Sequence, residues 1–235
     1  GIATCWEKEG NEGPVTEADI SVNQMLVEFL RSERPDYGWL SEESEDNLSR
    51  LEKNSCFIID PIDGTRSFIS GNKTWAHSFA ITKNGLPTAA VVYLPAFNDL
   101  YAAQLGKGAF LNQQPISVSG HRELDTASVL AGRPAQQANF WKNSNVPKFT
   151  RHHRPSLAYR LALVADGSYD AMITFRNSWE WDICAGALIA AEAGATVSDR
   201  TGDSLSFNQS RPVTKGAIAA PLTLHEDIMH RSDAH

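Results

Sequence analysis

Cysteine is scarce in this sequence: Cys5, Cys56 and Cys184 are the three in 235 residues. Their number is odd, they lie far apart, and Cys56 falls in an apolar run, so reduced thiols in a cytoplasm fit better than a disulfide framework. No apolar run approaches the roughly 20 residues that a membrane-spanning helix needs, and no signal peptide is recognisable. We therefore expect a cytoplasmic protein without a membrane partner.

Positive charge is also in deficit, with 21 Lys and Arg against 28 Asp and Glu and a formal net charge of −7. A protein that follows nucleic-acid phosphates needs a basic surface, so no nucleic-acid binding is expected. None of the 7 histidines falls in a ligand-spaced pair on an expected helix face, which disfavours a zinc site. A small anionic substrate would then need local cations, and divalent metal ions can supply them.

Apolar residues make up 42% of the chain, which is ample for a core, and the length suits one large domain or two compact halves. A polar interval at 119–126 is the best candidate for a domain boundary. It divides the chain into residues 1–122, with most of the acidic motifs described below, and residues 123–235, with the last of them. The chain lacks an initiator Met and residues 1–5 resemble the end of a helix, so we expect the natural chain to begin earlier.

Hydrophobic periodicity and turn residues predict alternating helices and strands. Helices are expected at residues 16–34, 66–70, 156–165, 183–193 and 224–230. Strands are expected at residues 37–40, 57–59, 77–83, 88–94, 99–105, 109–111, 116–118, 127–131, 171–175, 195–198 and 217–220. Residues 7–14 are predicted as a loop and residues 133–145 as weakly helical. Strands and helices mixed in this order indicate an α/β or α+β layered protein.

The most informative stretch is FIIDPIDGT at 57–65. Its apolar start predicts a buried strand that ends at Asp60, because Pro61 cannot continue a central ladder. Gly64 allows a tight turn, after which a short helix can begin with its free N–H groups pointing at the same spot. Asp60 and Asp63 then lie beside a helix N-terminus. Carboxylates attract cations and helix N-termini attract anions, so the arrangement suits a phosphate ester bridged to the protein by divalent metal.

Asp60 and Asp63 also fit other motifs to different degrees. Both can simply be Asx-turn residues, as in many Asp-Pro and Asp-Gly pairs. An EF-hand loop counted from Asp60 would place Ile62 at position 3 and Gly71 at position 12, which does not fit. The haloacid-dehalogenase motif needs two aspartates separated by one residue, whereas two residues separate Asp60 from Asp63. A phospho-aspartate intermediate is therefore not supported.

Three further acids each have an ordinary structural reading beside a functional one. Asp19 follows Thr16 at the spacing of a capping box. Glu42 is the first of two adjacent acids after an expected strand, which suits a solvated turn. Asp182 begins an expected helix and would interact favourably with its dipole. The residues alone leave both readings open at each position.

Five segments together resemble the inositol monophosphatase family: VTEAD at 15–19, LSEES at 40–44, DPIDGT at 60–65, WD at 181–182 and EAG at 192–194. The resemblance covers nearly the whole chain, and DPIDGT paired with the later WD is highly specific. It implies a magnesium-dependent, lithium-sensitive phosphatase with a layered αβαβα sandwich, metals held between its two halves, and a homodimer.

The resemblance also implies a set of site residues. The expected metal ligands, for two or three Mg²⁺ ions with Asp60 bridging, are Glu42, Asp60, the backbone carbonyl of Ile62, Asp63 and Asp182. Glu42, Thr65 and Asp19 would be catalytic, with the Thr65 hydroxyl close to the attacking water and bonded to Asp19. Gly64 and Thr65 would hold the phosphate through backbone N–H groups, and Asp182 would also contact the substrate. The expected chemistry is in-line attack by metal-activated water without a covalent intermediate.

The substrate is left open between two branches. Family members that act on inositol phosphate carry a Glu seven positions before the Asp of WD, where this chain has Phe175. The segments at 40–43, 65–69 and 180–182 look more like the 3′(2′),5′-bisphosphate nucleotidases, which act on adenosine 3′,5′-bisphosphate. The basic run RHHR at 151–154 either meets a second phosphate or forms a solvated loop. A fructose-1,6-bisphosphatase-like sugar phosphatase and a non-catalytic interaction protein on the same fold are the alternatives.

Overall fold

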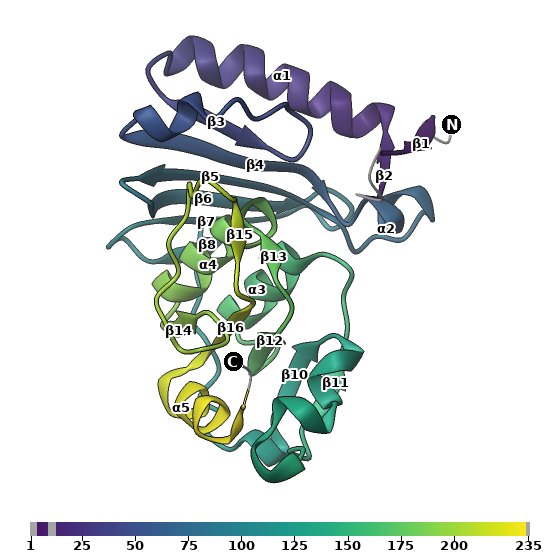
Figure 1. The fold of residues 1–235 in the computed structure, drawn as a ribbon, viewed down its shortest axis with the longest axis vertical. Helices are drawn as coiled ribbons and strands as arrows, with labels where there is room; N and C mark the ends of the chain where they lie inside the picture. The colour runs from purple at the N-terminus through teal and green to yellow at the C-terminus, as the bar shows by residue number, and fades with distance from the viewer. Residues whose placement is uncertain (1–3, 9–12, 234–235) are drawn as a thin grey trace.

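The computed structural model describes residues 4–8 and 13–233, and its layers alternate between helices and sheets (Figure 1). Helix α1 lies above a seven-stranded sheet, α3 and α4 lie between that sheet and a five-stranded one, and α5 covers the far side of the second sheet. This order confirms the predicted layered α/β (α+β) sandwich. Within the described residues, no helix is long and apolar enough to cross a membrane.

The elements have the following bounds. The helices are α1 (Glu17–Glu33), α2 (Thr65–Ile69), α3 (Leu157–Ala165), α4 (Glu180–Glu192) and α5 (Leu222–Arg231), with short 3-10 turns η2 (Ser49–Glu52), η3 (Leu124–Thr126), η4 (Arg133–Gln136), η5 (Ala138–Phe140) and η6 (Lys142–Ser144). The seven-stranded sheet has the order β3 (Gly38–Ser41), β4 (Ser55–Asp63), β5 (Ala76–Lys83), β6 (Leu86–Leu94), β7 (Asp99–Gln104), β8 (Ala109–Leu111) and β9 (Gln114–Pro115). The five-stranded sheet has the order β11 (Thr150–His152), β10 (Ser128–Ala131), β12 (Ala171–Thr174), β16 (Ala217–Pro221) and β14 (Ala195–Ser198). Two small antiparallel pairs join β1 (Cys5–Glu7) to β2 (Pro14–Thr16) and β13 (Ser178–Trp179) to β15 (Val213–Thr214).

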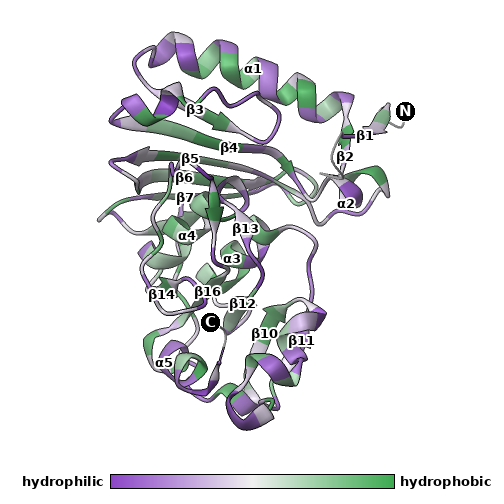
Figure 2. Ribbon diagram, in the orientation of Figure 1, coloured by the Kyte–Doolittle hydropathy of each residue, from purple (hydrophilic) through white to green (hydrophobic). Residues whose placement is uncertain are grey.

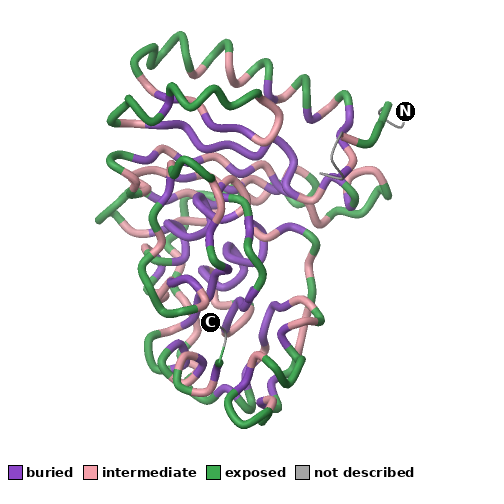
Figure 3. Tube along the Cα trace, in the orientation of Figure 1, coloured by how far each residue is buried: buried purple, intermediate pink, exposed green. Residues whose placement is uncertain are grey.

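Strand β4 is longer than the sequence predicts, because it continues past Asp60 to Asp63. Asp60 pairs with Ser78 and Asp63 with Ala76, so β4 carries one residue more than β5 between these pairs. Such a bulge accommodates Pro61, which lacks an N–H, without ending the pairing. The bulged strand is buried over most of its length (Figure 3).

Several smaller expectations are wrong. The strand expected at 116–118 is instead β9, which begins two residues earlier. Residues 5–7 form β1 rather than the end of a helix, and the ends of the expected loop at 7–14 belong to β1 and β2. The run at 151–154 begins on β11. Strands β11, β13 and β15 are two or three residues long, too short to show a period in the sequence. Residues 1–3 and 9–12 lie outside the described residues.

The larger apolar core joins both sheets through α3 and α4, which Figure 2 shows mostly in hydrophobic colours. Small residues on α4 allow the two helices to pack closely. A Cβ atom on Gly186 would lie 2.5 Å from Cβ of Leu161 on α3, which is closer than two carbon atoms can approach. Because this core includes Leu40 of one sheet and Ala219 of the other, the division at 122/123 stays a prediction.

Helix α1 begins at a complete capping box, as the sequence predicts. Thr16 accepts hydrogen bonds from the first turn, and the Asp19 side chain accepts one from the Thr16 backbone N–H. The apolar residues of the helix are less buried than their spacing suggests, since Met25 is 59% and Phe29 62% exposed. The described residues of α1 therefore contribute to the site through their polar N-terminal turn more than to the core.

Candidate active site

The acidic site forms where β3 and β4 end side by side. The two strands are parallel and place Ser41 opposite Ile59, so the residues that follow each strand reach the same edge of the sheet. The backbone N–H of Glu42 donates to the carbonyl of Ile59 at 3.2 Å. Glu42 is thereby held next to Asp60, the first residue of the bulge.

Helix α4 supplies a third carboxylate from the opposite layer. Ser78, which pairs with Asp60 across β4 and β5, donates its hydroxyl to the carbonyl of Trp181 at 2.8 Å. This contact fixes the first turn of α4 and its Asp182 over the bulge. Carboxylate oxygens of Glu42, Asp60 and Asp182 lie within 4.8 Å of one another. The structure therefore brings together three acids from distant parts of the chain.

Asp63 lies on the same bulge but is held by α3. Its Oδ2 accepts hydrogen bonds from the Ser156 hydroxyl and from the backbone N–H of Ala158, each at 2.7 Å. Ser156 is the N-cap of α3 and also accepts from the Tyr159 backbone N–H. The N-terminus of α3 thus locks one of the expected metal ligands in place.

Burial and mutual repulsion disfavour the charged forms of these acids. Burial raises the pKa of Asp60 well above its usual range, and the charges of Glu42 and Asp63 raise it further. Burial likewise raises the pKa of Asp182, with repulsion from Asp63 and Glu42. For Asp63, burial outweighs its hydrogen bonds and raises its pKa to about 6. A bound cation relieves this repulsion, and a donor set made only of oxygens fits Mg²⁺.

Thr65, Asp19 and Gly64 lie beside the acids. The Thr65 hydroxyl lies 3.2 Å from Oδ1 of Asp19 and 3.1 Å from the carbonyl of Ile62. The other oxygen of Asp19 makes the capping box, so the structural and functional readings of this residue are compatible. Gly64 caps α2 with φ of +100°, a conformation that favours glycine.

Lys8 is a site neighbour that the sequence reasoning missed. Its ammonium group lies 2.9 Å from Glu42 and 2.6 Å from Glu43, so the β1–β2 hairpin reaches the acidic cluster. No spacing rule connects Lys8 with acids more than thirty positions away. The interpretation of the acids after β3 as a solvated turn is wrong for Glu43, whose side chain is 5% exposed.

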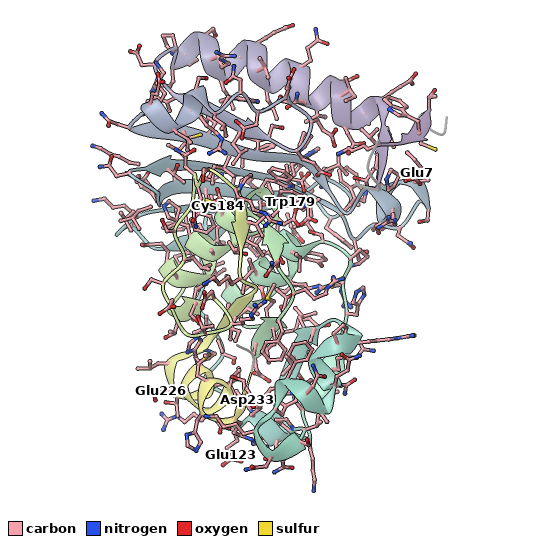
Figure 4. The ribbon with its side chains drawn as sticks, viewed as in Figure 1. Glu7, Glu123, Trp179, Cys184, Glu226 and Asp233 are labelled. Atoms are coloured by element: carbon pink, nitrogen blue, oxygen red, sulfur yellow. The ribbon has the colours of Figure 1, made fainter. Side chains whose placement is uncertain are left out.

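Two stacked tryptophans form a wall of the cavity above the acids. The rings of Trp179 and Trp181 lie 4.8 Å apart at 10°, and both line the cavity together with Asp182 and Gly64. Trp179 is 41% exposed, and Figure 4 labels it where β13 meets α4 below the large sheet. The buried Nε1 of Trp181 has no hydrogen-bond partner among the described residues. The cavity therefore offers an aromatic face beside its carboxylates.

Phe175 lies in the smaller apolar core, away from the residues that line the cavity of the acids. It is 3% exposed, and its ring stacks on Phe140 at 4.9 Å and meets Trp141 edge-on at 5.6 Å. An apolar ring packed in this way cannot accept hydrogen bonds from the hydroxyl groups of a polyol.

Comparison with known proteins places this chain in a family. A sequence profile described as the inositol monophosphatase family matches residues 3–235. The chain belongs to this family.

The relatives of this chain carry names that denote different functions. A fructose-1,6-bisphosphatase/inositol-1-monophosphatase of Thermotoga maritima is 32% identical over 228 residues, 95% of this chain and 84% of the relative. The Nus factor SuhB of Salmonella typhimurium is 33% identical over 202 residues, 83% of this chain and 75% of the relative. The crystal structure of the extragenic suppressor protein SuhB from Bartonella henselae matches with a TM-score of 0.82 at 28% identity, over 97% of this chain and 87% of that one. Family membership and the phosphatase name support a phosphatase activity.

Proposed function

We propose that this protein is a Mg²⁺-dependent phosphate-monoester hydrolase acting on a small phosphorylated polyol or nucleotide. The observation that carries the proposal is the meeting of Glu42, Asp60 and Asp182, with carboxylate oxygens within 4.8 Å of one another. Burial and mutual repulsion make it costly for three acids held this close to be charged together, and a divalent cation would offset that cost. A phosphate monoester dianion needs the same positive charge.

The chain's own residues have distinct parts in this reaction. Glu42, Asp60, Asp63, Asp182 and the carbonyl of Ile62 would hold two or three Mg²⁺ ions. When bound, these ions neutralise the phosphoryl oxygens and lower the pKa of coordinated water. The hydrogen bonds from α3 to Asp63 keep that carboxylate oriented before substrate arrives.

Beside the acids, Thr65 and Asp19 would position the attacking water. Asp19 fixes the Thr65 hydroxyl next to the Ile62 carbonyl, where it can hydrogen-bond a water aimed at phosphorus. The backbone N–H groups of Gly64 and Thr65 would bind the phosphate, since the first N–H groups of a helix lack intrahelical partners. Asp182 would also contact the substrate.

The enzyme would be a cytoplasmic, lithium-sensitive homodimer. The free thiols of Cys56 and Cys184 support a cytoplasmic location. Family membership supports sensitivity to lithium and a homodimeric assembly.

A second candidate is a non-catalytic interaction protein on this fold. It is favoured by the relative named as a Nus factor. The four expected acids, Glu42, Asp60, Asp63 and Asp182, all line one cavity, which supports catalysis instead. A sugar bisphosphatase is a third reading, favoured by the Thermotoga maritima relative.

The experiment is Asp60→Asn assayed for Mg²⁺-dependent phosphate release, with the exposed Asp36→Asn as matched control. Removing one buried carboxylate from the cluster should lower kcat/KM at least about a thousandfold, and Asp36→Asn should match wild type. Circular dichroism and the melting temperature show whether the variant is folded. A folded Asp60→Asn protein that keeps its turnover refutes the proposal.

A further inference from the structure

One edge of the five-stranded sheet carries a cation on every strand. Strands β11, β10 and β12 are parallel, and β14 runs the same way because β12 and β14 are both antiparallel to β16. An arginine stands two residues past the end of each of these four strands, and a lysine stands two residues before the start of β16. In sheet order these residues are Arg154, Arg133, Arg176, Lys215 and Arg200, which we call the cation row.

Composition alone does not account for the cation row. Lys and Arg make up 21 of the 235 residues, so cations at five equivalent positions on five strands are not expected by chance. Neighbouring strands lie about 4.8 Å apart, which gives the backbone of the row a span of about 19 Å. The carboxyl ends of parallel strands are also where open α/β sheets bind their ligands.

Backbone contacts hold one half of the row together. The Arg200 backbone N–H donates to the carbonyl of Lys215 at 3.0 Å. Nη1 of Arg200 donates to the carbonyl of Phe175 at 3.0 Å, directly before Arg176. These three cations therefore stand next to one another at the ends of β14, β16 and β12.

The other half of the row lies around His153. Burial lowers the pKa of His153, and the charges of four arginines, with Arg154 and Arg133 among them, lower it further. Arg160 is another of the four, but it is buried and its charge is attracted by Asp63. It therefore does not belong to the cation row.

Within the described residues, no carboxylate forms an ion pair with the cation row. The exposed members Arg133, Arg176 and Lys215 make no side-chain hydrogen bond in this part of the chain, and the other two donate only to neutral oxygens. The buried Nε of Arg200 has no partner there. The adjacent Asp199 is engaged in its own turn, where its Oδ1 accepts from two backbone N–H groups at 2.8 and 3.1 Å. The row is therefore a local positive surface on a chain of net charge −7.

We infer that the cation row is a docking surface for an extended acidic segment of a partner protein. About six residues of extended chain, at about 3.3 Å per residue, match the length of the row, whereas a single small anion would meet one or two of its members. Arginine binds carboxylates in a bidentate geometry. None of the five residues lines the cavity of the acids, so this surface is separate from the candidate active site.

The charge of the whole chain favours a short acidic segment over a nucleic acid. A nucleic-acid strand carries its phosphates well beyond the ends of the row, where it would meet a protein with more acids than bases. An acidic segment of about six residues ends within the row.

A fluorescein-labelled peptide of six glutamates is the probe, with binding to the full chain read by fluorescence anisotropy in metal-free buffer. Wild type should bind it at about 20 mM salt and at least about threefold more weakly at about 150 mM salt, because salt screens exposed charges. A labelled peptide of six serines should not bind. A labelled uridine hexanucleotide is the nucleic-acid probe.

Variants assign the binding to the row. The double variant Arg133→Gln and Arg176→Gln changes two exposed residues and should weaken binding of the glutamate peptide about tenfold. The control Arg31→Gln and Arg34→Gln removes the same charge from exposed positions near the end of α1 and should bind as wild type does. Both double variants should keep the melting temperature of wild type, which shows that they are folded.

Three results would overturn the inference. The first is a folded wild type that does not bind the glutamate peptide at low salt. The second is equal weakening by both double variants, because net charge alone would then explain the binding. The third is a uridine hexanucleotide that binds the row at least about tenfold more tightly than the peptide, which would assign a nucleic-acid partner instead. The assay needs no turnover, so its result does not depend on the proposed hydrolysis.

Discussion

Ser156→Ala removes two hydrogen bonds that meet at one hydroxyl group. The Ser156 hydroxyl donates to Asp63 at 2.7 Å and accepts from the Tyr159 backbone N–H at 2.9 Å as the N-cap of α3. Loss of an N-cap costs about 1 kcal/mol. Loss of a hydrogen bond to a buried carboxylate costs about 1.5–3 kcal/mol. The free energy of unfolding should fall by about 3 kcal/mol, which lowers Tm by about 6–12 °C in a chain of this size.

Urea unfolding and calorimetry in metal-free buffer measure this change. A second readout is the pH dependence of kcat/KM with Mg²⁺. The hydrogen bond from Ser156 lowers the pKa of Asp63, so its loss should move the acidic limb of the profile to higher pH. The control is Ser32→Ala, at an exposed position on α1. A Tm within about 1 °C of wild type and an unmoved acidic limb would refute the reasoning that α3 stabilises the site through Asp63.

Two further predictions concern stability. The pKa of Asp63 is raised from 3.8 to about 6 in the folded chain. The free energy of unfolding of the metal-free protein should therefore fall by about 3 kcal/mol as the pH rises from about 4 to about 6, because the folded state holds this proton more tightly than the unfolded state. Urea unfolding from pH 4 to 7 checks this against Asp63→Asn, and identical pH dependence in the two proteins would contradict it. Gly186→Val places a side chain against Leu161, whose Cβ lies 2.5 Å from the ideal Cβ position, and should lower the free energy of unfolding by at least about 2 kcal/mol. An unchanged urea midpoint would show that α3 and α4 do not pack as closely as described.

The parts of the site that could be predicted are local in sequence. DPIDGT places Asp60, Asp63 and Thr65 on one bend. The apolar run before it predicts a buried strand, so these residues are expected at the edge of a sheet. The prediction that the strand stops at Asp60 failed because a bulge absorbs Pro61 and because the Asp60 side chain accepts from the Ile62 N–H at 2.9 Å. The alternation of apolar and polar residues in a sequence does not reveal such a bulge.

The parts that could not be predicted depend on contacts between distant segments. Lys8 reaches Glu42 only because the β1–β2 hairpin folds back over the sheet edge. Ser156 lies 93 positions from Asp63, and nothing in its local sequence says that its hydroxyl donates to this carboxylate. Such contacts between distant segments are a property of the tertiary structure.

The most direct test of the central claim is to locate a bound metal ion. Crystals of the full chain soaked in Mn²⁺, which replaces Mg²⁺ at oxygen ligands, should give an anomalous peak within coordination distance of Glu42, Asp60 and Asp182. Crystals that are fully soaked but show no peak among these three carboxylates would contradict the account.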